Sequence, residues 1–222
     1  MNRRPMLLVS AATLGAMFLV SAWAWTQLPP DAQVPIHWGV DGQPDDWADK
    51  TVGLFLLPLI ATGVAVLLAL IPRFEPRRAN LERSGKAYGA TWIGIMLLLG
   101  GMHLLAISVA LGASLDLTRI VMVATGALFV LIGNYLPKVQ PNYLMGIRTP
   151  WTLASDLAWR RTHRIGGRLF VIEGLILAGL GLLGASGALL VAAVLGAVVV
   201  LLAVTVVYSY QVWKMDPDKR HP

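Results

Sequence analysis

Two ionisable residues stand within long apolar stretches of this 222-residue chain, at positions suited to proton, ion or metal chemistry. His103 lies near the middle of one stretch, and Glu173 lies about two turns into another. Ionisable groups are costly to bury in a membrane, so they are functional candidates by default. Both residues could act in transport, proton relay or metal binding, or they could only form hydrogen bonds within the protein. The two side chains could also pair with each other if their depths agree.

An acidic segment that contains tryptophan, residues 27–51, provides a second set of candidates. They are His37, Trp38, Asp41, Asp45, Asp46 and Trp47. Tryptophan anchors and carboxylate partners suit a cationic amphipathic peptide, whereas His37 and the aspartates could hold a divalent cation, although their spacing is not that of a calcium loop. Alternatively, the tryptophans belong to an interfacial aromatic belt. The Asp41-Gly42 turn signal and the extended character of 34–38 predict a hairpin or flap, ordered as a lid over the helices.

A third set of polar and aromatic residues lies between positions 133 and 170. They are Asn134, Lys138, Asn142, Arg148, Trp151, Trp159, His163 and Arg164. Asn134 is expected to cap a helix or to hydrogen bond to another helix. Arg148 could bind backbone carbonyls and lock the loop, or it could hold an anionic lipid or a partner group. For His163, a surface or hydrogen-bonding role is favoured over metal ligation.

A short amphipathic helix is expected at 156–165, because three prolines between 137 and 150 preclude one continuous helix through the loop. It would lie as an elbow on the inner membrane surface, with Trp151 and Trp159 at headgroup depth. Asp156 and Arg160 have the i,i+4 spacing of an ion pair.

Familiar catalytic motifs are absent from the sequence. It contains no HExxH, GxSxG or Walker loop and no paired membrane aspartates. It also has no cysteine, which excludes thiol catalysis and cysteine-ligated metal sites. The sequence therefore predicts a protein that is not an enzyme and has no cofactor or metal.

The composition indicates an integral membrane protein, whose spanning helices must position these candidates. Hydrophobic residues make up 56% of the chain and charged residues 14%, against about 25% charged in ordinary soluble domains. A spanning helix needs about 20 apolar residues. Six stretches qualify, at 6–26, 52–71, 88–113, 117–136, 167–185 and 187–210. A turn at 184–187 separates the last two, so we expect an all-α bundle of six transmembrane helices that ends in a tight helical hairpin.

Basic residues are concentrated on one side of this six-helix arrangement. The two termini and the loops 72–87 and 137–166 carry most of them, whereas the opposite side has only Lys50 and Arg119. The positive-inside rule then predicts that both termini are cytoplasmic. The net charge of +6 reflects this topology and contact with anionic lipid, rather than direct nucleic-acid binding. An alternative is that the N-terminal stretch is a signal peptide, whose cleavage near Ala24 would leave five spans.

The inner segment resembles the SdpI family, whose signature looks like GN…PK…N…GIRTPWTL followed by W…THR and a glycine pair. This sequence supplies Gly133, Asn134, Pro137, Lys138, Asn142, Gly146, Ile147, Arg148, Thr149, Pro150, Trp151, Thr152, Leu153, Trp159, Thr162, His163, Arg164 and Gly166. The outer segment PIHWGVDGQPDDW, followed by Lys50, is similar to the domain of unknown function that commonly precedes that signature. The resemblance covers most of the chain.

This resemblance implies a multi-pass protein of the bacterial cytoplasmic membrane that acts in immunity and signal transduction. Such a protein would bind a secreted antimicrobial peptide or toxin at its outer face and relay this to a cytoplasmic repressor at its inner loops. We expect one membrane domain, 1–222, with an outer lid at 27–51, a basic loop at 72–87 and a signature loop at 137–166. The alternative is a small transporter or a metal-dependent membrane protein that uses His103 and Glu173.

Overall fold

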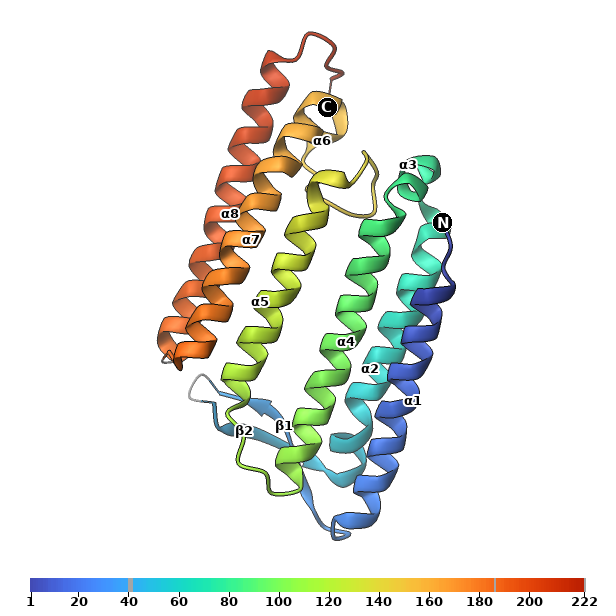
Figure 1. The fold of residues 1–222 in the computed structure, drawn as a ribbon, viewed down its shortest axis with the longest axis vertical. Helices are drawn as coiled ribbons and strands as arrows, with labels where there is room; N and C mark the ends of the chain where they lie inside the picture. Colours follow the sequence, from blue (N-terminus) through green and yellow to red (C-terminus); the bar gives the residue numbers. More distant parts are fainter. Residues whose placement is uncertain (40–41, 186, 222) are drawn as a thin grey trace.

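Six long helices and one short β-hairpin make up the protein in a computed structural model, which describes residues 1–39, 42–185 and 187–221 (Figure 1). In chain order the elements are α1 (Arg4–Gln27), β1 (Gln33–Trp38), β2 (Pro44–Asp49), α2 (Lys50–Leu70), the 3-10 turn η1 (Ile71–Phe74), α3 (Arg78–Arg83), α4 (Gly85–Ala110), α5 (Leu117–Tyr135), the 3-10 turn η2 (Leu136–Lys138), α6 (Pro150–Ala154), α7 (Asp156–Leu183) and α8 (Gly187–Met215).

The predicted set of six spanning helices is confirmed. By length and composition, the six segments that could cross a membrane are Arg4–Gln27, Lys50–Phe74, Gly85–Ala110, Leu117–Lys138, Asp156–Leu183 and Gly187–Met215. The expected hairpin between the last two is also present. Helix α7 ends at Leu183 and is capped by Gly184, whose φ of 67° favours glycine, and α8 packs back against α7.

The long helices form two groups that lie side by side (Figure 1). In one group α1, α2 and α4 pack against one another, and in the other α7 packs between α5 and α8. The contact of α4 with α5 joins the two groups. Both chain ends lie at the same end of the molecule, and the β-hairpin lies at the opposite end (Figure 1).

Glycines bring α5 and α7 into direct backbone contact. A Cβ added at Gly174 would lie 2.5 Å from the carbonyl oxygen of Gly126, and one added at Gly133 would lie 2.6 Å from that of Gly167. In lipid no hydrophobic effect drives helices together, so close van der Waals packing through small residues provides much of the association energy. The two glycine pairs therefore set the spacing of this helix pair.

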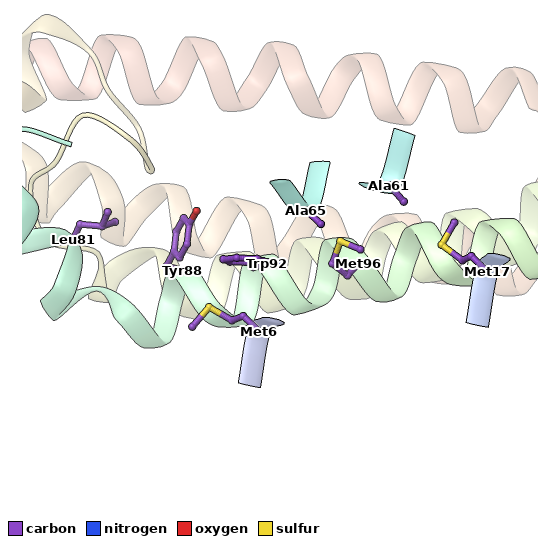
Figure 2. Close-up of a cluster of buried hydrophobic side chains, with 8 residues drawn as sticks. All are labelled: Met6, Met17, Ala61, Ala65, Leu81, Tyr88, Trp92 and Met96. Carbon is purple, nitrogen blue, oxygen red and sulfur yellow. The ribbon is translucent and has the colours of Figure 1, made fainter. Parts of the chain in front are cut away.

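The core of the other group consists of methionine, aromatic and alanine side chains, some of which have polar anchors (Figure 2). Its buried members are Met6, Met17, Ala61, Ala65, Leu81, Tyr88, Trp92 and Met96. The indole Nε1 of Trp92 donates to Ser10 Oγ at 2.8 Å, and the hydroxyl of Tyr88 donates to the carbonyl of Leu68 at 2.6 Å. Aromatic groups buried in this way satisfy their polar atoms and hold α4 in register with α1 and α2.

The outer segment forms the expected hairpin. Strands β1 and β2 pair antiparallel, with Val34 opposite Ala48. Val34 is fully buried and packs on Gly53, where a Cβ would overlap the valine side chain. Asp49 ends β2 and caps α2, because its carboxylate accepts the backbone N–H of Thr51 at 2.8 Å. The hairpin is therefore tied to the helix that follows it.

The prediction of a separate elbow helix at 156–165 was wrong, because these residues form the first turns of the continuous helix α7. No proline interrupts them, and Gly166 and Gly167 allow close packing without a break. The indole of Trp159 is fully buried within the protein, so it is not on the exposed face of a surface helix. Asp156 and Arg160 form no ion pair among the described residues; Arg160 instead lies close enough to Asp216 to act on its charge.

Candidate functional site

A cavity of about 570 Å³ lies beneath the hairpin and is lined by residues of both helix groups. Its walls come from β1, α2, α4, α5 and α8 and are mostly apolar, with Leu57, Met102, Val121 and Leu190 among the lining residues. The volume falls in the range of small-molecule and peptide side-chain pockets in proteins. The sequence placed no cavity here, because its walls come from segments that are far apart in the chain.

His103 lines this cavity and is hydrogen bonded on its far side to α1. Its Nε2 lies 3.0 Å from Ser21 Oγ and 3.2 Å from the carbonyl of Met17. The Ser21 hydroxyl donates to the carbonyl of Leu54 at 2.6 Å, so it accepts from the imidazole. These roles place the ring proton on Nε2 and leave Nδ1 as an acceptor, for which no partner is found among the described residues. His103 is thus a buried, bonded histidine that also faces a cavity.

The hairpin residues predicted as a ligand site are divided between the cavity and the outer surface. His37 and Trp38 line the cavity, and His37 Nδ1 lies 2.6 Å from Asp45 Oδ1. Asp46 accepts the backbone N–H of Trp47 at 2.9 Å, and the Trp47 side chain is exposed. Asp41 lies outside the described residues. The fold therefore brings His37 and Trp38 together with His103, a grouping that the sequence did not predict.

A metal centre has no ready ligand set in this region. Within residues 1–39, 42–185 and 187–221, no three His, Asp or Glu side chains are grouped so that they could hold an ion. The hydrogen-bonded pair of His37 and Asp45 is exposed at the surface.

Asn142 organises the signature loop at the other end of the molecule. It is fully buried, and its Oδ1 accepts the backbone N–H groups of Leu144 and Met145 at 2.8 Å each. Arg148 donates from Nη1 to the carbonyl of Tyr143, which confirms the expectation that it binds a backbone carbonyl. Both side chains therefore fix the path of the loop.

Sequence reasoning missed the acidic residue that joins this loop to the preceding basic loop. The carboxylate of Glu75 is buried and accepts the backbone N–H of Tyr143 at 3.0 Å and that of Arg77 at 2.8 Å. Ser84, at the start of α4, likewise accepts the N–H of Gln140 at 2.9 Å. A lone glutamate among arginines at 73, 77 and 78 was the only available signal for this contact.

His163 is the internal support of the loop. Its Nδ1 donates to the carbonyl of Trp159 at 2.8 Å, and its Nε2 accepts the N–H of Ile147 at 3.0 Å. The ring stacks on Trp159 at 4.0 Å between centroids, and the indole Nε1 of Trp159 donates to the carbonyl of Val139 at 2.8 Å. The favoured hydrogen-bonding role of His163 is confirmed, with both nitrogens occupied and the side chain buried.

The segment after the loop is fastened to the C-terminal helix. Thr149 and Thr152 form a capping box at α6, and the Thr149 hydroxyl donates to Ser209 Oγ at 3.0 Å. The Ser155 hydroxyl donates to Asp216. This hydrogen bond, with smaller help from nearby Lys219 and Arg160, holds the pKa of Asp216 below its ordinary value.

The other candidate site residues at this end of the molecule are only partly buried or are exposed. The Trp151 ring is half-buried against Tyr210, with centroids 5.2 Å apart. Lys138 lies over the ring of Tyr135. Asn134 and Arg164 are exposed, and within the described part of the chain neither side chain has a hydrogen-bond partner, so the capping or interhelical bond expected of Asn134 is absent.

Glu173 and His103 do not meet. Glu173 belongs to α7 in one helix group, whereas His103 is bonded to α1 in the other. The Glu173 side chain is buried, and its Oε1 has no hydrogen-bond partner in the described residues. A direct pair between the two ionisable residues is therefore not formed.

Comparison with known proteins finds matches for the segments that form both ends of the molecule. Residues 138–209 match the model of the SdpI/YfhL protein family, and residues 12–62 match a domain of unknown function, DUF1648. The chain is 23% identical over 207 residues to "Immunity protein SdpI" of Bacillus subtilis (strain 168), covering 93% of this chain and 95% of that protein. No solved structure matches it. The chain is thus a multi-pass membrane protein whose signature loop, built around Asn142, Arg148 and His163, lies in a segment that matches the SdpI/YfhL protein family.

Proposed function

We propose that this protein gives its cell immunity to a secreted antimicrobial peptide by binding an apolar part of that peptide in the cavity beneath the hairpin. The cavity itself is the observation that carries the proposal, because a pocket of about 570 Å³ with mostly apolar walls suits large hydrophobic side chains. The name of the relative from Bacillus subtilis, an immunity protein, supports this reading. The proposed role is binding rather than catalysis.

The charge at the rim of the cavity indicates what kind of peptide it would accept. The hairpin carries the exposed acidic side chains of Asp45 and Asp46 beside the exposed ring of Trp47. Carboxylates attract a cationic peptide, while the indole provides apolar contact area at the interface. A cationic amphipathic peptide would thus place its basic residues on the rim and its apolar residues in the cavity.

This proposal requires the hairpin to face outward and both termini to be cytoplasmic. The hairpin lies opposite the chain ends (Figure 1). Most basic residues belong to the termini and to the loops 72–87 and 137–166. The positive-inside rule then supports a bacterial cytoplasmic membrane location with the signature loop inside. We also propose that α1 is retained rather than cleaved, because it supplies Met17 and Ser21, which hydrogen bond to His103.

Helix α4 is the proposed route from the cavity to a cytoplasmic partner such as a repressor. It carries His103 at the cavity, and it begins next to Ser84, which accepts a hydrogen bond from the signature loop. A ligand that shifts α4 would therefore act on the loop around Gln140. If amide exchange in residues 139–149 stayed unchanged when a protective peptide bound, the relay would be rejected and binding alone would remain.

A survival assay tests the binding site. Ala106→Phe places a large ring in the cavity, while Ala203→Phe makes the same change at an exposed position on α8 that does not line it. Wild type and variants would be produced at equal membrane levels in a sensitive host and challenged with a panel of secreted antimicrobial peptides. We expect cells that produce Ala106→Phe to be inhibited at a peptide concentration about tenfold lower than cells with wild type, which corresponds to about 1.4 kcal/mol of lost binding. Cells that produce Ala203→Phe should be protected like those with wild type.

The result of this assay can also reject the proposal. Equal protection by wild type and Ala106→Phe, with both proteins monodisperse in detergent, would show that the cavity is not the site. Absence of protection by wild type against every peptide would reject immunity as the function.

A transporter is the second candidate, favoured by the buried Glu173 whose Oε1 has no partner in the described residues. In this case Glu173→Gln, which keeps size but removes the ionisable group, would abolish activity while changes in the hairpin would only weaken it. The immunity proposal predicts the opposite order of sensitivity. The same survival assay with Glu173→Gln therefore separates the two functions.

A further inference from the structure

A second cavity, of about 470 Å³, lies at the end of the molecule that carries the termini. It is bounded by the first residues of the chain, the start of α4 and the end of α5. This cavity is distant from the hairpin and does not share residues with the outer cavity.

Cationic side chains dominate the charge of this second cavity. Arg83, Lys86 and Lys138 line it, and within the described residues none of the three forms an ion pair. The acidic lining residue, Glu82, is already paired with Arg78 at 3.3 Å. The cavity therefore presents about three positive charges without internal neutralisation, which favours an anionic ligand.

The depth of these cations in the membrane indicates which kind of anion the cavity suits. Lys86 is the second residue of the spanning segment Gly85–Ala110, and Lys138 is the last residue of the spanning segment Leu117–Lys138. Both amines therefore stand where two spanning helices meet the headgroup region. Basic pockets between spanning helices at this depth suit the phosphate of anionic lipids.

The remaining lining residues fit the neck of a lipid. The ring of Tyr135 and the side chain of Met1 provide apolar surface beside the cations. A phosphate could lie among the amines while the glycerol and the first acyl carbons contact these apolar groups. A soluble anion would use only the charged part of such a site.

We propose that this cavity binds the headgroup of an anionic phospholipid, such as phosphatidylglycerol, from the adjacent leaflet. Lys86 and Lys138 contact the phosphate, and Arg83 adds charge at the rim. The lipid would then hold the start of α4 to the end of α5, the two helices that join the two groups. This inference does not depend on the peptide-binding function.

The test measures lipid affinity of the full chain in detergent by native mass spectrometry, with phosphatidylglycerol and phosphatidylcholine as probes. Wild type is expected to prefer phosphatidylglycerol, and Lys86→Gln with Lys138→Gln is expected to weaken its binding by about 10-fold to 30-fold, given the typical contribution of two basic residues near lipid. Arg164→Gln with Arg168→Gln removes the same charge from exposed positions on α7 and should leave the preference unchanged.

Three outcomes would overturn the proposal. The first is an unchanged lipid preference in the Lys86→Gln, Lys138→Gln variant, and the second is an equal loss in the α7 control, which would indicate only general charge. The third is displacement of phosphatidylglycerol by excess inorganic phosphate, which would identify a site for free anions. Elution volume and thermal stability of each variant verify that the fold is retained, so a loss of binding reports the site.

Discussion

At the scale of single residues, the signature loop depends on one glycine beside one histidine. Gly146 has a φ of 107°, in a region that favours glycine, and a Cβ there would overlap Nε2 of His163. The same Nε2 accepts the N–H of Ile147. The absence of a side chain at position 146 thus allows the imidazole to approach the backbone and hold the loop.

Gly146→Ala should therefore destabilise the protein for two reasons. The backbone strain of a non-glycine residue costs about 1–3 kcal/mol, and the displaced His163 loses a hydrogen bond of about 1 kcal/mol. Gly112 is a matched control, because its φ is 93° but a Cβ there would meet no atom within 4 Å. We expect Gly146→Ala to lower the thermal midpoint in detergent more than Gly112→Ala does. Equal shifts would mean that contact with His163 is unimportant.

At the scale of elements, α7 combines two roles that the sequence suggested were separate. Its first turns carry Trp159 and His163, which support the signature loop, and its later turns carry Gly167 and Gly174, which pack on α5. Because the helix is continuous, the position of α7 against α5 also sets the position of His163 beneath the loop. Packing within the membrane and loop structure outside it are therefore mechanically connected.

The glycine crossing gives a prediction at this scale. Gly174→Ala should destabilise the α5–α7 pair by about 1–3 kcal/mol, the usual range for overpacking, because its Cβ would lie 2.5 Å from the carbonyl of Gly126. Gly179→Ala on the same helix is the control, since no atom lies within 4 Å of its added Cβ. Thermal unfolding in detergent measures both. A Gly179→Ala variant as unstable as Gly174→Ala would indicate that helix flexibility, not close packing, requires the glycines.

At the scale of the whole molecule, chemistry is divided between two ends. The acidic hairpin lies at one end, and the termini and the signature loop lie at the other (Figure 1). The hairpin lines the apolar cavity, and the first residues of the chain line the basic cavity. Helix α4 extends between them, and with α5 it joins the two helix groups. The arrangement suits a protein that binds a ligand on one side of a membrane and presents a different surface on the other.

The orientation of the molecule is directly testable because the chain has no cysteine. Gln33→Cys places a thiol at an exposed site on the hairpin, and Asp218→Cys places one in the exposed C-terminal tail. A membrane-impermeant maleimide added to intact cells should label Gln33→Cys alone, because the basic end is expected to be cytoplasmic. Both variants should react after the membrane is opened. Labelling of Asp218→Cys in intact cells would contradict the proposed topology.

The sequence alone determined the six spanning helices through hydrophobic length and the outer hairpin through its turn signal, and its signature residues carried the resemblance to the SdpI family. These features are local, because a spanning segment needs only enough consecutive apolar residues and a signature needs only its residues in order. A bond to a backbone carbonyl was one of the two roles expected of Arg148, and a surface or hydrogen-bonding role was favoured for His163, because the chemistry of both side chains limits their partners. The separate elbow helix was wrong, since whether Trp159 faces lipid or protein depends on what α7 packs against.

Only the tertiary structure decided which distant residues come together. His37 and His103 share a cavity whose walls also include α5 and α8, and Glu75 reaches the signature loop from a different segment. The uncoupled positions of His103 and Glu173 follow from the division of the helices into two groups. Such contacts depend on the order and rotation of the helices in the bundle. The same six apolar segments are compatible with many arrangements, and close packing at glycine pairs such as Gly126 and Gly174 selects one of them.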